Sequence, residues 1–144
     1  MKYKVLVTPR SFAESSDVPL RLLEESGCDV VRNPHGRPLT EIELIGLIKD
    51  VDGVIVGLDR VSREVIAAAD RLKVISKYGV GLNNIDLEAA RASGVVVTYT
   101  PGTNSEAVAD LAIGLLLAAA RKIPLADRSV RSGDWRKFVG FAVW

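Results

Sequence analysis

Two glycines one residue apart mark the segment of this 144-residue chain best suited to binding a small anion. The loop Tyr78-Gly79-Val80-Gly81 follows a short apolar segment, residues 73–76. Glycines let a backbone approach a ligand closely, and successive N–H groups of such a loop can point at a carboxylate or phosphate. The spacing also opens a dinucleotide-binding fingerprint, which fails because Asn84 occupies the third glycine position. On spacing alone, a tight turn and an anion-binding loop both remain open.

Two other places hold polar groups that could act on a ligand. In Gly57-Leu58-Asp59-Arg60, the charged pair either acts on a ligand or forms a surface ion pair. Asn104 either faces a ligand or simply caps the helix that it precedes. His35 lies in a turn with no partner carboxylate implied nearby, so a catalytic role is not favoured. The sequence shows no Ser/His/Asp or Cys/His arrangement, and one cysteine and one histidine leave no zinc site.

Short apolar segments alternate with helical patterns along the first hundred residues. Strands are expected at residues 4–8, 28–32, 53–57, 73–76 and 95–98. Helix starts are marked by Thr40 with its capping-box partner Glu43, by Ser62 and by Asp86. This alternation predicts an α/β fold with a doubly wound, parallel, five-stranded sheet. The number of strands favours the flavodoxin-like order 2-1-3-4-5, which is a fold-level prior and is not fixed by the sequence. Ligands bind such sheets at the carboxyl ends of the strands, where the glycine loop and the Gly57–Arg60 loop both fall.

The pattern changes after Thr100-Pro101-Gly102. A helix expected from Glu106 to Lys122 has almost no polar face, which predicts burial between two domains or two subunits. Pro124 is expected to break it, and a second, amphipathic helix is expected to run to Ser132.

Composition excludes several classes of partner. The chain is 48% hydrophobic and 26% charged with a net charge of +1, which gives no reason to expect nucleic-acid or membrane binding. The longest apolar run, Leu111–Ala120, is too short to span a bilayer, and the N-terminus does not resemble a signal peptide. The single Cys28 excludes an internal disulfide. We therefore expect a cytoplasmic protein.

The segment from Leu72 to Asp86 resembles the signature loop of the NAD-dependent D-isomer-specific 2-hydroxyacid dehydrogenases. The resemblance continues without a gap to Ala112 and includes Arg121-Lys122-Ile123-Pro124 and Gly133-Asp134-Trp135. It is dense from Val51 to Trp135 and thinner before that. Within the family it is greatest to the branch that oxidises 3-phosphoglycerate in serine biosynthesis.

The resemblance implies a division into a flavodoxin-like substrate-binding domain, residues 1–99, and the first helices of a truncated NAD-binding domain, residues 100–144. The helix at 106–122 and the arm after it would form a homodimer. A small 2-hydroxyacid or 2-oxoacid would be the substrate, and NAD the cofactor. The substrate contacts implied are Tyr78, Gly79, Val80, Gly81, Leu58, Arg60 and Asn104. Of these, Val80 and Asn104 would also lie near the cofactor.

Three departures from the family pattern qualify these expectations. Asn83 replaces an Asp found in many relatives, and Gly57-Leu58 replaces an Arg-Ser of the phosphoglycerate branch, so Arg60 is the candidate for that basic contact. The family's Gly-x-Gly-x-x-Gly motif and its catalytic Arg, Glu and His would follow Trp144. The chain is therefore expected to be an N-terminal fragment that is inactive alone and does not bind NAD tightly.

Two other classes of protein share elements of this pattern. A stand-alone, non-catalytic flavodoxin-like module for binding or dimerisation fits the same elements. A phosphoacceptor receiver domain fits poorly, because Thr8-Pro9-Arg10 stands where such domains need an acidic pair.

Overall fold

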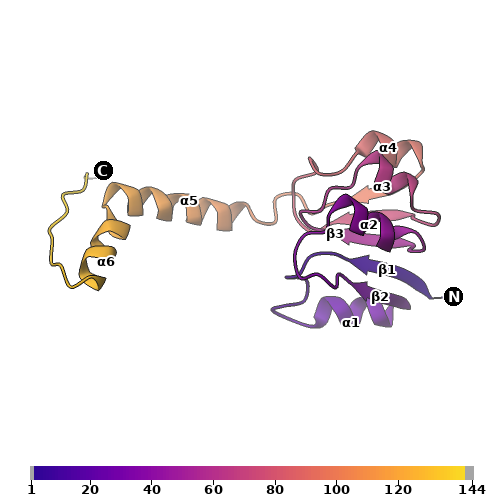
Figure 1. The fold of residues 1–144 in the computed structure, drawn as a ribbon, viewed down its shortest axis with the longest axis horizontal. Helices are drawn as coiled ribbons and strands as arrows, with labels where there is room; N and C mark the ends of the chain where they lie inside the picture. The colour runs from indigo at the N-terminus through magenta and orange to yellow at the C-terminus, as the bar shows by residue number, and fades with distance from the viewer. Residues whose placement is uncertain (1, 142–144) are drawn as a thin grey trace. The chain divides into compact units, whose positions relative to one another are not determined.

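The computed structural model describes residues 2–141 and divides into two compact units, residues 1–101 and 102–144. The first unit contains a sheet of five parallel strands in the order β2-β1-β3-β4-β5, which confirms the predicted topology (Figure 1). The strands are β1 (Tyr3–Val7), β2 (Cys28–Arg32), β3 (Gly53–Val56), β4 (Val74–Lys77) and β5 (Val96–Thr98). In register, Leu6 of β1 lies beside Val31 on one side and Val54 on the other.

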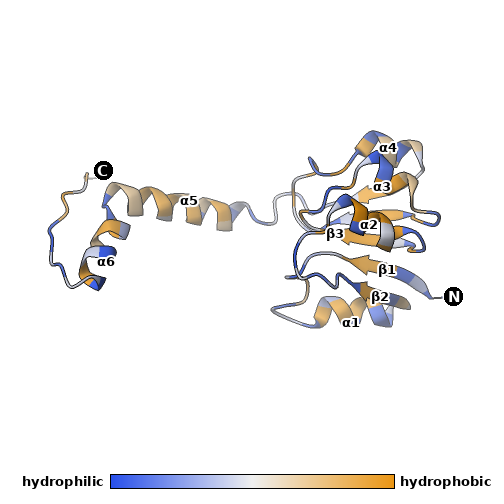
Figure 2. Cartoon of the chain, in the orientation of Figure 1, coloured by the Kyte–Doolittle hydropathy of each residue, from blue (hydrophilic) through white to orange (hydrophobic). Residues whose placement is uncertain are grey.

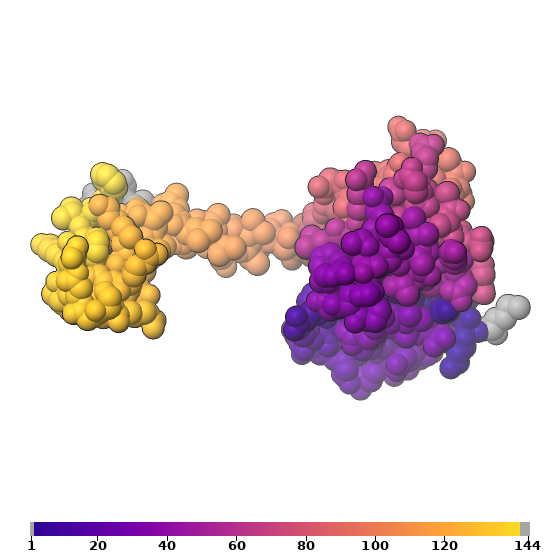
Figure 3. Space-filling model, viewed as in Figure 1, coloured from indigo at the N-terminus to yellow at the C-terminus, as the bar shows by residue number. Residues whose placement is uncertain are grey.

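Helices cover both faces of the sheet, as a doubly wound fold requires. They are α1 (Val18–Glu25), α2 (Glu41–Ile48), α3 (Arg63–Ala67) and α4 (Leu87–Ala92). One core joins Leu6, Val54 and Ile75 of the strands to buried side chains of α2, α3 and α4. A smaller core on the other face joins alternate strand residues to α1 through Leu20 and Leu23. The side chains of this unit pack into one continuous body (Figure 3).

The predicted helix caps are confirmed. The Thr40 hydroxyl accepts a bond from the Glu43 amide at 3.3 Å, and the Glu43 carboxylate accepts one from the Thr40 amide at 2.8 Å. Ser62 caps α3 and Asp86 caps α4 through bonds from the Val65 and Ala89 amides. These caps satisfy amides that have no partner within their own helix.

Small shifts in strand boundaries matter for the site. β1 ends at Val7, so Thr8 belongs to the loop that follows it, and β4 extends to Lys77 rather than ending at Ser76. Lys77 pairs with Val56 in the sheet register. The sheet therefore fixes the backbone of Lys77 directly before the glycine loop.

The second unit holds α5 (Ser105–Ala120) and α6 (Ile123–Arg131). Asn104 occupies the N-cap position of α5, but its side chain makes no capping bond, so the expected cap is not formed. The helix also ends before Lys122, whose φ of 55° produces the break. Pro124 is not the breaker: it lies in the first turn of α6, where the missing N–H costs nothing.

Apolar residues dominate the part of α5 that Figure 2 shows, and the sequence of the helix has no polar side chain after Asp110. Burial on all sides was expected, yet no residue of α5 is buried among the described residues, and Leu111 is 63% exposed. Nothing within residues 2–141 supplies the cover that such a surface requires. In the described part of the chain, no helix has both the length and the hydropathy needed to cross a membrane.

Candidate substrate site at the carboxyl edge of the sheet

Loops at the carboxyl ends of the strands line a cleft of about 580 Å³ in the first unit. The loop after β1 contributes Thr8 to Ser11, the loop after β2 contributes Gly36 to Pro38, and the loop after β3 contributes Gly57 to Asp59. Tyr78 follows β4 and completes the wall. This volume is sufficient for a small organic acid.

Two of the four amides in the glycine loop are already engaged. The Tyr78 amide donates to the Val56 carbonyl at 2.8 Å, and the Gly79 amide donates to the Lys77 carbonyl at 3.0 Å. Gly79 has a φ of 132°, which favours glycine. Within the described residues, the amides of Val80 and Gly81 donate to no protein acceptor. The predicted anion-binding role therefore narrows to these two N–H groups.

Asp59 is buried, with 2% exposure, and it does not pair with Arg60 at the surface as one interpretation of the sequence held. Its carboxylate accepts bonds from the Leu39 amide at 2.7 Å, from the Gly57 amide at 3.3 Å and from the Thr8 hydroxyl. The surface-pair interpretation is wrong because the carboxylate instead joins the loops that follow β1, β2 and β3.

Arg60 and Leu58 lie at different clefts. Leu58 is 81% exposed and lines the cleft beside Tyr78. Arg60 lines a separate cleft of about 620 Å³ with Arg63 and Asn83, and its Nε lies 3.9 Å from a Glu41 carboxylate oxygen. Leu58 and Arg60, which were both expected to contact the substrate, therefore line different clefts.

Lys77 and Asn84 tie the two central loops to each other. Lys77 Nζ donates to the Gly57 carbonyl at 2.5 Å and to Asn84 Oδ1 at 2.7 Å, and Asn84 Nδ2 donates to the Asp59 carbonyl at 2.5 Å. Burial lowers the pKa of the Lys77 ammonium. The sequence interpretation missed this pair. The available signals were a lysine closing an apolar strand and an asparagine at the failed third glycine position.

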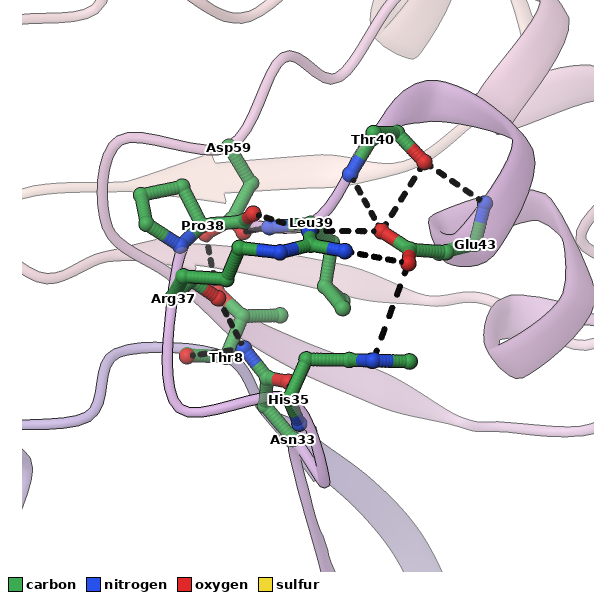
Figure 4. Close-up of polar contacts among 9 residues, drawn as sticks. All are labelled: Thr8, Asn33, His35, Arg37, Pro38, Leu39, Thr40, Glu43 and Asp59. Atoms are coloured by element: carbon green, nitrogen blue, oxygen red, sulfur yellow. Dashed lines mark hydrogen bonds and ion pairs between the residues drawn. The ribbon is translucent and has the colours of Figure 1, made fainter.

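Polar contacts also fix the loop after β2 (Figure 4). Arg37 donates two bonds to Glu43, at 2.9 and 2.7 Å, and His35 Nδ1 lies 3.6 Å from the same carboxylate. His35 therefore does have a carboxylate partner, contrary to the expectation. Side-chain bonds from Arg37, then backbone and side-chain bonds from Thr40, hold the pKa of Glu43 well below its ordinary value of 4.5. The described residues contain no group of three or more acidic, His or Cys side chains that could hold a metal.

The lowered pKa of Glu43 predicts a loss of stability in acid. A carboxyl whose folded-state pKa lies below its unfolded value stabilises the fold above that unfolded value, and the contribution disappears as the pH falls through the range below 4.5. We expect E43Q to unfold with a weaker dependence on pH than the wild type in urea denaturation between roughly pH 5 and pH 3. E25Q, which alters an exposed α1 carboxyl, is the control and should follow the wild type. Identical pH dependences for E43Q and the wild type would contradict the assignment.

A parallel α/β domain with a glycine loop and a cleft at its carboxyl edge belongs to the broad class of small-ligand-binding α/β domains. The family model for the catalytic domain of D-isomer specific 2-hydroxyacid dehydrogenases matches residues 8–140. The chain therefore belongs to this family of NAD-dependent oxidoreductases, as the sequence resemblance predicted.

Individual relatives agree with this assignment. The chain is 41% identical to a D-3-phosphoglycerate dehydrogenase of Methanocaldococcus jannaschii, over 98% of this chain and 26% of that protein. It is 46% identical to a glyoxylate reductase of Thermococcus litoralis, over 95% of this chain and 40% of that protein. The crystal structure of a Polaromonas protein described as an NAD-binding, D-isomer specific 2-hydroxyacid dehydrogenase superposes on this chain with a TM-score of 0.86. The two are 30% identical, and the match covers 99% of this chain and 45% of that one. The chain thus spans less than half the length of these relatives.

Proposed function

We propose that this chain is the substrate-binding domain, with the start of the cofactor domain, of an NAD-dependent D-2-hydroxyacid dehydrogenase that oxidises 3-phosphoglycerate. The observation that supports this most directly is the pair of Val80 and Gly81 amides without a protein acceptor. They follow Gly79 in the chain, and Gly79 follows Tyr78, the residue of this loop that lines the cleft. These two N–H groups would bind the substrate carboxylate. On this proposal the whole protein acts in the cytoplasm, in serine biosynthesis.

The chain's own residues would hold and orient the substrate. Two preformed amide donors favour a carboxylate because they need no reorganisation when it binds. Gly79, the residue before these two amides, has a φ of 132°, a backbone conformation that favours glycine. Leu58 and Tyr78 form the exposed wall beside the bound acid. The Tyr78 ring is itself braced edge-on against Phe12, with centroids 5.8 Å apart.

The residues present do not fit the phosphate groups of NAD. A dinucleotide fingerprint places its glycines directly at a helix N-terminus, whereas here a turn separates Gly81 from α4, which begins at Leu87. When bound in the whole protein, NAD would accept the hydride from the substrate. This chain would contribute only the Val80 and Asn104 contacts, and Asn104, in the second unit, stays a prediction from the resemblance. The basic contact expected of Arg60 also stays a prediction.

Amide chemical shifts test the proposed carboxylate site directly. We expect D-glycerate, titrated into the 15N-labelled chain, to shift the Val80 and Gly81 amides in a saturable manner and to move the engaged Tyr78 and Gly79 amides less. Glycerol, which lacks the carboxylate, is the matched control and should leave all four amides in place. Saturable shifts confined to the cleft of Arg60 and Arg63, or none at all, would contradict the proposal. If the chain were instead a non-catalytic flavodoxin-like module that serves only for dimerisation, no saturable shift would be expected.

The isolated chain is expected to bind NADH weakly or not at all. Its glycine loop does not form a pyrophosphate site, and no other glycine-rich turn opens a helix in the described residues. Fluorescence titration with NADH checks this. Micromolar affinity would show that the chain contains a cofactor site that its sequence and structure do not reveal.

The chain is expected to self-associate through α5 and the arm that follows it. The exposed apolar residues of this helix would otherwise face water, at a cost of about 25 cal/mol for each Å². Sedimentation should show a dimer for the wild type and a shift toward monomer for L111E. D110N, which alters a neighbouring position without adding charge to the apolar surface, should stay dimeric. A wild type that is monomeric at tens of micromolar would contradict the prediction.

A further inference from the structure

Two arginines line the cleft of the proposed substrate site, and only one of them is free to bind a ligand. The Arg37 guanidinium is held by two bonds to Glu43, and a third bond, at 3.0 Å, reaches the Pro38 carbonyl. Its donors are therefore committed to the loop that they stabilise. Moving this side chain onto a substrate would break a bidentate ion pair.

Arg10 is the other arginine, in the loop after β1. Its side chain is 76% exposed, and its one ion-pair partner within the described residues is Glu14, with the Arg10 Nε and a Glu14 carboxylate oxygen 3.9 Å apart. Both side chains are exposed, and a contact of this length at the surface contributes little. The guanidinium can exchange this weak contact for a better one with a ligand.

The position of Arg10 suits contact with the far end of a bound acid. It lines the 580 Å³ cleft with Ser11, and it also lines the adjoining cleft of about 290 Å³ with Asn33 and Gly36. The β1 loop and Tyr78 of the glycine loop line this cleft from different strands, because β3 lies between β1 and β4 in the sheet. An acid held by the glycine loop at its carboxylate would therefore extend across β3 toward the β1 loop.

Arg60, the cation that the sequence suggested for this contact, lines a different cleft and lies near Glu41. The cleft that contains Leu58 and Tyr78 thus has Arg10 as its one arginine without a close ion pair among the described residues. A planar guanidinium binds phosphate or carboxylate oxygens with two parallel hydrogen bonds.

We propose that Arg10 binds a second anionic group on the distal carbon of the substrate and so selects 2-hydroxyacids that carry one. The proposal rests on the proposed function, because it assumes that the cleft holds a 2-hydroxyacid by its carboxylate. Ser11 lies beside Arg10 and offers a hydroxyl to the same group. Glu14 opposes binding, since its carboxylate competes for the guanidinium and repels an incoming anion.

The test compares three acids in steady-state assays of the full-length protein with NAD. The acids are 3-phosphoglycerate, D-malate and D-glycerate, whose distal groups are a phosphate, a carboxylate and an uncharged hydroxyl. For R10Q we expect the KM of the preferred acid with a charged distal group to rise about tenfold or more, with kcat little changed, because a ground-state contact is removed. The constants for D-glycerate should not change. Whether the effect falls on 3-phosphoglycerate or D-malate identifies the distal group as phosphate or carboxylate.

Further variants separate the explanations. E14Q should lower the KM of the same acid, and R10K should recover part of the loss. R21Q, which alters an exposed α1 arginine outside both clefts, should match the wild type. The inference is overturned if R10Q affects D-glycerate equally, or if R60Q and not R10Q removes the preference for an acid with a charged distal group. If the wild type oxidises none of the three acids, the proposed function fails and the inference falls with it.

Discussion

D59A is expected to lower the free energy of unfolding of this chain by about 4 kcal/mol, the largest effect of any single substitution proposed for it. The buried carboxylate is an acceptor for the Leu39 and Gly57 amides and the Thr8 hydroxyl. Alanine would remove the acceptor of the Leu39 amide and the Thr8 hydroxyl, while the Gly57 amide would keep only its 3.4 Å bond to the Thr8 hydroxyl oxygen. Each unsatisfied buried donor costs about 1–3 kcal/mol. The negative charge that favours the buried Lys77 ammonium would also be lost.

Urea denaturation of the 144-residue chain measures this loss. D59N retains the shape and one acceptor oxygen, so its loss should be smaller than that of D59A. D29A removes an exposed carboxyl of β2 and should change stability by less than about 0.5 kcal/mol. If D59A were as stable as D29A, the carboxylate could not be what joins the three loops.

K77M is expected to cost about 2–3 kcal/mol and to weaken substrate binding as well. Methionine matches lysine in length but donates no bond, so Asn84 Oδ1 loses its partner and the Gly57 carbonyl keeps only the Asn84 amide at 3.1 Å. The loops after β3 and β4 would then be tied less firmly, and the Val80 and Gly81 amides held less precisely. In the glycerate titration, the saturable amide shifts should appear at higher ligand concentrations.

The pH dependence of stability tests whether the Lys77 ammonium is buried in the folded chain or the side chain only fills space. Burial lowers its pKa in the folded state, so the unfolded chain binds more protons between that value and the ordinary 10.5. Stability of the wild type should therefore rise with pH in that window, relative to K77M. K49M, at an exposed lysine after α2, should keep the wild-type rise. Parallel pH profiles for the wild type and K77M would show that the ammonium is not buried in the folded protein.

Local signals predicted most of the sheet and the helix starts. Capping at Thr40, Ser62 and Asp86 depends on residues within three positions along the chain, so sequence spacing suffices to find it. The βα alternation predicted a parallel, doubly wound sheet because handed crossovers leave few topologies, but the strand order itself came from a fold-level prior for five strands. The errors arose where a partner is distant in sequence. His35 meets Glu43 across a turn, and Asp59 meets Leu39 from the neighbouring loop.

The glycine loop also has some features that depend on neighbouring residues and others that depend on partners distant in the sequence. The sequence by itself determined that two closely spaced glycines follow a strand at the ligand-binding edge of a parallel sheet, because glycine spacing and strand pattern are local properties. Only the tertiary structure decided which amides are free, since the Tyr78 amide is engaged by a carbonyl of the neighbouring strand β3. It also placed Arg60 at one cleft and Arg10 at another, because the direction of a loop side chain depends on contacts that are far apart in the chain.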